Sequence, residues 1–87
     1  MDPPAGEMIY LATVYSHFGA IRLRRELKKE SIEGTLQPVP RALSSSCGTC
    51  LRFEAPPDFR LPAYLREDVE KLAEETAGGY RVLEESL

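Results

Sequence analysis

The 87-residue sequence has little of several features that define common protein classes. It contains no tryptophan, one histidine and two cysteines. No apolar run approaches the roughly 18 residues that a membrane-spanning helix needs. The opening residues also lack the basic and apolar regions of a signal peptide. We therefore expect a cytoplasmic protein with no membrane span.

An excess of positive charge is also missing. The chain holds 11 basic and 14 acidic residues, for a formal net charge of −3, so it has no general attraction to phosphate backbones. We expect its partners to be proteins, and no nucleic acid. A hydrophobic fraction of 43% and a charged fraction of 29% are ordinary for a globular chain. We expect a flexible leader over residues 1–7, which holds two prolines and one glycine, and a single domain over 8–87.

The first two thirds of the domain show strand, helix, strand and strand patterns in turn. Residues 8–15 form a nearly unbroken apolar and β-branched run, which predicts a central strand. Residues 16–29 begin with a serine that can cap a helix and repeat apolar side chains at helical spacing. Residues 35–40 contain two prolines and predict an edge strand. Residues 51–54 alternate apolar and charged side chains, as a half-exposed strand does.

The last third predicts a second helix and a final strand. Leu65, Val69, Leu72 and Thr76 follow each other at steps of four, three and four, which predicts a helix over about 62–77. Gly78 and Gly79 would end it, and 80–84 would form the last strand. The predicted fold is α+β, a ferredoxin-like β-α-β-β-α-β sandwich with two helices on one face of an antiparallel sheet. A homodimer through the other sheet face is a possible assembly.

Both cysteines lie in the loop that joins the two middle strands. Cys47 and Cys50 are three positions apart, so their thiols could meet each other, one metal ion or one oxidant. In a reducing cytoplasm a permanent disulfide between them is not expected. This loop is therefore the candidate site.

The residues around the two thiols are suited to an anionic sulfur. A thiol reacts as the thiolate, which nearby donors and positive charges favour. Gly48 would allow the main chain to approach the sulfur closely. His17, the single imidazole, could assist if it lies beside Cys47, although a surface histidine at a helix start is the commoner case. The other candidate residues for binding the anion are Arg41, Ser44, Ser45, Ser46 and Arg52.

Four interpretations of the cysteine pair remain open at this point. A thioredoxin-type redox site would place the pair at a helix N-terminus, whereas residues 51–54 have a strand pattern. A zinc site needs four ligands, so two chains would each have to contribute Cys47 and Cys50. Two ordinary buried cysteines are a third interpretation, although a polar loop rarely buries side chains. A carrier that holds sulfur on one cysteine is the fourth.

Several segments together resemble a known family. They are SHFGA at 16–20, PVPR at 38–41, LSSSCG at 43–48 and LRF at 51–53. In order and spacing they resemble the selenium/sulfur (Se/S) carrier-like proteins over about residues 8–85. Members of that family stand alone or follow a sulfur-relay carrier domain, which implies a role in moving sulfur or selenium between proteins. The hallmark Ser-Cys-Gly cysteine of the family maps onto Cys47, whereas the position of Cys50 is often not cysteine.

The resemblance and the loop chemistry together predict a carrier rather than an enzyme acting on a small substrate. Cys47 would accept sulfur or selenium from a donor protein, hold it as a persulfide or selenosulfide, and give it to an acceptor protein. Cys50 would release the product through a Cys47–Cys50 disulfide. No cofactor is required. The alternatives are a small dimeric binding or regulatory domain with zinc on Cys47 and Cys50, or a thiol-disulfide redox protein.

Overall fold

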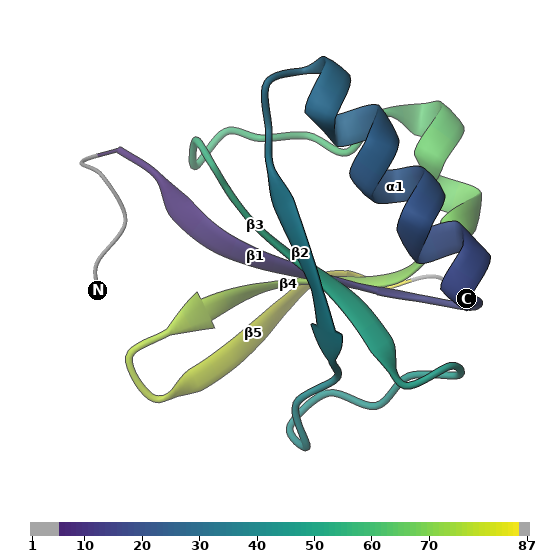
Figure 1. The fold of residues 1–87 in the computed structure, drawn as a ribbon. Helices are drawn as coiled ribbons and strands as arrows, with labels where there is room; N and C mark the ends of the chain where they lie inside the picture. The colour runs from purple at the N-terminus through teal and green to yellow at the C-terminus, as the bar shows by residue number, and fades with distance from the viewer. Residues whose placement is uncertain (1–5, 86–87) are drawn as a thin grey trace.

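The computed structural model describes residues 6–85 and shows one five-stranded antiparallel sheet with its helices on one side (Figure 1). The elements in chain order are β1 (Met8–Val14), α1 (His17–Lys29), β2 (Gly34–Pro38), β3 (Thr49–Ala55), the 3-10 helix η1 (Ala63–Asp68), β4 (Val69–Thr76) and β5 (Gly79–Glu85). The α+β class is confirmed. Most of the predicted leader lies outside the described residues. Within 6–85, no helix is long and apolar enough to cross a membrane.

The sheet order β2-β3-β1-β4-β5 places the strand predicted as central, β1, in the middle and the strand predicted as an edge, β2, at one edge. β1 and β2 are both antiparallel to β3, so they run parallel to each other, with α1 as the connection between them. Ser16 caps α1, because its Oγ accepts a hydrogen bond from the Gly19 backbone N–H at 3.0 Å. This half of the fold follows the sequence pattern closely.

The second helix predicted over 62–77 is wrong, and with it the ferredoxin-like order of elements. Only residues 63–68 are helical, as one short 3-10 segment, and residues 69–76 form β4 beside β1. A two-residue turn then leads into β5, which becomes the second edge of the sheet. Residues 6–85 therefore form five strands where four were predicted.

A β-bulge in β4 explains why this strand has a helical pattern. Thr13 of β1 pairs with Lys71, but the next residue, Val14, pairs with Val69, so Glu70 is an extra residue without a partner. The extra residue shifts the strand alternation by one. Val69 and Leu72, three positions apart, consequently both pack into the core under the helices. A spacing of three on one face is also the signature of a helix.

Hydrophobic side chains pack on both faces of the sheet. The larger cluster lies under α1 and η1 and includes the stacked rings of Tyr10 and Phe53, with centroids 5.5 Å apart. The smaller cluster lies on the opposite face and consists of Ile9, Leu11, Leu43, Cys50 and Ala73. Leu43 comes from the β2–β3 loop, so this loop covers part of the face that carries no helix.

Candidate functional site

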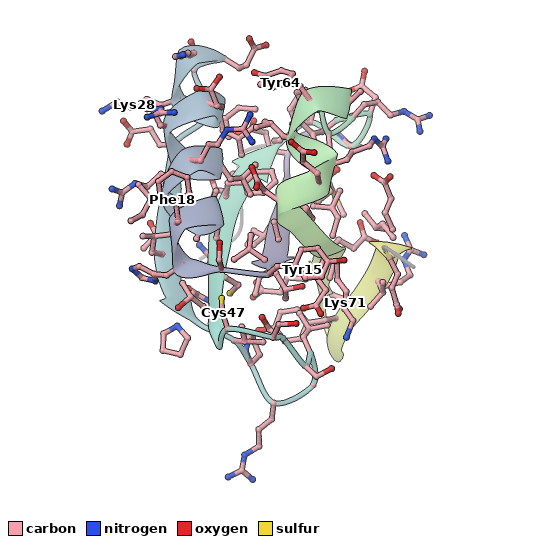
Figure 2. The ribbon with its side chains drawn as sticks, turned by 90° about the vertical axis from the view of Figure 1, so that its right-hand side faces the viewer. Tyr15, Phe18, Lys28, Cys47, Tyr64 and Lys71 are labelled. Carbon is pink, nitrogen blue, oxygen red and sulfur yellow. The ribbon has the colours of Figure 1, made fainter. Side chains whose placement is uncertain are left out.

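Cys47 lies at the junction of β1, α1 and β3. Its thiol can donate to the Val14 carbonyl oxygen at 3.5 Å or to the Thr49 carbonyl oxygen at 3.7 Å. The side chain is partly exposed and packs against the edge of the larger core cluster. Figure 2 shows Cys47 at the end of α1 where the helix begins. The sulfur therefore occupies a defined position that solvent can reach.

Three hydroxyl groups fix the loop that carries Cys47. Ser45 Oγ donates to the Val14 carbonyl oxygen at 3.2 Å. Ser46 binds the Glu70 carboxylate twice, through its backbone N–H at 3.2 Å and its Oγ at 2.9 Å. Lys71 Nζ contacts Ser44 at two atoms, the carbonyl oxygen at 3.2 Å and Oγ at 2.9 Å. The serines that we predicted to face the sulfur anion thus bind mainly to β1 and β4.

Gly48 provides the turn between Cys47 and β3. Its φ is 77°, in the left-handed region that residues other than glycine rarely adopt. Apart from the neighbouring residues Cys47 and Thr49, a Cβ at this position would meet no atom within 4 Å. The left-handed backbone conformation therefore explains why glycine occupies this position.

His17 and Cys47 are linked through Thr49. The Nδ1 atom of the exposed His17 lies 3.4 Å from Thr49 Oγ1, while the Cys47 thiol points to the carbonyl of the same threonine. This places the imidazole at the same end of α1 as the thiol.

The two predicted arginines do not surround the thiol. Arg41 is exposed in the turn that begins at Pro40. Arg52 points to the opposite face of the sheet, where its guanidinium lies 3.9 Å from the Glu75 carboxylate. Among the hydrogen bonds of residues 6–85, neither arginine reaches Cys47. A charge that stabilises an anionic sulfur would have to come from another group.

Cys50 has a different environment from Cys47. It is fully buried in the smaller cluster, next to Leu11 and Leu43, and its thiol points to the Pro38 carbonyl oxygen at 3.7 Å. Burial raises the pKa of the Cys50 thiol; a hydrogen bond with Gln37 lowers it and the neighbouring Cys47 raises it. Both cysteines are free. The two thiols thus face different sides of the sheet.

The zinc alternative requires a second chain that contributes its own Cys47 and Cys50. Within residues 6–85 no three cysteine, histidine or acidic side chains form a group that could hold a metal ion. In this chain Cys47 packs against the larger cluster and Cys50 lies in the smaller one.

Several residues of the site were not predicted from sequence. Glu70 and Lys71 lie within 62–77, where the sequence pattern predicts a helix, so their contacts with the loop could not be foreseen. Tyr15 and Phe18 flank the start of α1 and expose 44% and 75% of their surface. Figure 2 places both on the side of the molecule that shows Cys47. Large exposed aromatic side chains beside a reactive group are typical of protein contact surfaces.

Comparison with known proteins identifies the family. The class that the fold and site define is a small α+β protein with one accessible loop cysteine. The family model described as "Putative Se/S carrier protein-like" matches residues 9–76, which is most of the chain, and the protein belongs to this family. No curated protein and no solved structure matches the chain in these comparisons.

Proposed function

We propose that the protein carries sulfur or selenium on Cys47 and transfers it between two other proteins. The observation that carries the proposal is the contrast between the two thiols. Cys47 is partly exposed in a loop that five hydrogen bonds of Ser44, Ser45 and Ser46 hold in place, whereas Cys50 is buried. The Se/S carrier family to which the chain belongs supports the same cargo.

The transfer step exchanges one bond between chalcogen atoms for another. The Cys47 thiolate attacks the outer sulfur of a persulfide on a donor protein. A bond forms between Cys47 Sγ and that sulfur, the S–S bond of the donor breaks, and the donor leaves as a thiolate. A nucleophile on the acceptor protein repeats the step on the outer sulfur of Cys47. No external oxidant or reductant is needed, and the same scheme applies when the outer atom is selenium.

The surroundings of Cys47 suit this reaction. Cys47 lies at the end of α1 where the helix begins (Figure 2), and the free backbone N–H groups of a first helical turn favour negative charge nearby. The carbonyl oxygens of Val14 and Thr49 can each accept a hydrogen bond from the thiol and so orient it in the resting state. The proposal gives Cys50 no step, because its thiol lies on the other face of the sheet. A cytoplasmic setting remains part of the proposal.

Intact-mass measurement tests this function. The protein is incubated with a cysteine desulfurase and cysteine, or with glutathione persulfide, and its mass is compared with that of an untreated sample. We expect the addition of one sulfur atom in the wild type and in Cys50→Ala, and none in Cys47→Ser. The same assay with a selenium-bearing donor tests the second cargo. An unmodified Cys47, under conditions that load another carrier protein in the same tube, would contradict the proposal.

A further inference from the structure

We infer that the groove between α1 and the free edge of β2 binds an acidic, extended segment of a partner protein, which adds to the sheet as a further strand. The groove has a volume of about 470 Å³. Its lining comes from one side of α1 and from the start of β2, and consists of Ile21, Arg24, Arg25, Lys28, Glu33 and Gly34. This site is separate from the carrier function and does not depend on it.

The groove is lined by three cations, Arg24, Arg25 and Lys28, and by one carboxylate, Glu33, so its net charge favours an anionic partner. Among the ion pairs of residues 6–85, Arg24 and Lys28 have none, and Arg25 contacts only Glu26, at 3.4 Å. Arg24 and Lys28 are four positions apart on the helix, where like charges repel each other. A carboxylate placed between them would relieve that repulsion. Although the chain has a net charge of −3, Arg24, Arg25 and Lys28 form a local group of positive charge.

The edge of β2 offers backbone groups for pairing. The Val39 N–H donates to the Gly48 carbonyl on the β3 side at 3.1 Å. Because backbone groups alternate between the two sides of an antiparallel strand, Thr35 and Gln37 also face β3. Gly34 and Leu36 then direct their N–H and C=O groups away from the sheet. Figure 1 shows β2 at the near edge with no strand in front of it.

The alternation of side chains along a strand determines which residues the partner needs. An added strand would point every second side chain toward the helix side, where Arg24 and Lys28 lie above the edge. Glutamate or aspartate at those positions would meet the cations, and the half-exposed Ile21 offers an apolar contact. Pro38, which has no N–H to donate, ends the pairing at the other end of β2. The groove thus fits a short acidic segment of about four residues.

The groove is distant from the sulfur site along the helix. Lys28 lies at the end of α1 opposite to Cys47 (Figure 2). A partner held at this groove would therefore leave the thiol open to another protein.

A titration followed by NMR tests this inference. The probe is a synthetic peptide in which glutamate alternates with threonine or valine, and the control peptide has glutamine in place of glutamate. We expect chemical-shift changes at Arg24, Lys28 and Leu36 with the first peptide, and slower hydrogen exchange of the Leu36 amide on binding. The double change Arg24→Glu, Lys28→Glu should weaken binding by about tenfold or more. A matched double change at exposed loop positions, Arg41→Glu with Arg60→Glu, should leave it unchanged.

Four outcomes would overturn the inference. They are equal binding of the glutamine peptide, shift changes on another face, tighter binding of a single-stranded RNA oligonucleotide, and self-association through β2 without any peptide. If the reversed-charge variant does not fold, Lys28→Gln supplies the same comparison with a smaller expected loss. The wild-type HSQC spectrum is the reference for folding in each case.

Discussion

The carboxylate of Glu70 accepts two hydrogen bonds from Ser46, one from its backbone N–H at 3.2 Å and one from its hydroxyl at 2.9 Å. Glu70 is the extra residue of the bulge in β4, and Ser46 directly precedes Cys47. Bulges commonly redirect one side chain out of the regular alternation. The bulge in β4 thus provides the carboxylate that binds the residue preceding Cys47.

Replacing Glu70 with Gln should loosen the loop. An amide has only one acceptor oxygen, so one of the two bonds from Ser46 is lost. We expect the free energy of unfolding to fall by about 0.5–1.5 kcal/mol, and the Ser46 amide to exchange with solvent faster. Urea unfolding and hydrogen exchange measure the two effects. Glu67→Gln, at an exposed position of η1, is the control and should change neither.

Alkylation should separate the two cysteines. In the native protein, iodoacetamide should modify Cys47, which is partly exposed, and leave the buried Cys50 unmodified. Mass spectrometry of the intact protein should then show a single adduct, and Cys47→Ser should show none at the same time point. In denaturant both thiols should react. A first adduct on Cys50 would mean that the loop does not hold the position described.

The first half of the fold was predictable because each of its elements carries its own signal. The apolar run of β1, the Ser16 cap and the proline of β2 each determine structure locally. The pattern of residues 69–76 could not be assigned correctly, since Val69 and Leu72 share a face only through a bulge. The bulge depends on pairing with Thr13 and Val14, about 55 residues earlier in the chain, and no local pattern reports such a pairing.

The candidate site was predictable in composition but not in geometry. The accessible loop position of Cys47 and the nearby start of α1 with His17 agree with the sequence-based expectation. The opposite orientation of Cys50 follows from strand alternation, which puts Leu51 and Phe53 under the helices and Cys50 on the other face. Arg52 follows the same alternation. The strand predicted over 51–54 begins at Thr49 in the structure. Had it been predicted from Thr49, the same alternation would have placed Cys50 on the face opposite to Leu51.

Gly34 should be hard to replace because the Leu51 side chain of β3 leaves no room for a Cβ. A Cβ at this position would lie 2.7 Å from Leu51 Cδ1 and 2.8 Å from its Cγ. We expect Gly34→Ala to lower the free energy of unfolding by about 1–3 kcal/mol, as overpacked cores do. Gly78→Ala is a suitable control, since a Cβ there meets nothing within 4 Å. Equal stabilities of the two variants in urea would contradict the packing described.

The buried thiol of Cys50 should make stability fall at alkaline pH. Burial raises its pKa in the folded state, whereas in the unfolded chain a cysteine has a pKa of about 8.5. Below that value the thiol is protonated in both states and the stability is fully present. Above it the unfolded chain releases the proton while the folded chain keeps it, so the free energy of unfolding should decrease by up to about 1.4 kcal/mol per pH unit. Urea unfolding between about pH 8 and pH 9.5 under reducing conditions, below the range where tyrosines ionise, measures this slope. The Cys47→Ser variant should retain the slope, and the Cys50→Ala variant should lose it. If the slope persists in Cys50→Ala, the loss of stability at alkaline pH comes from another group.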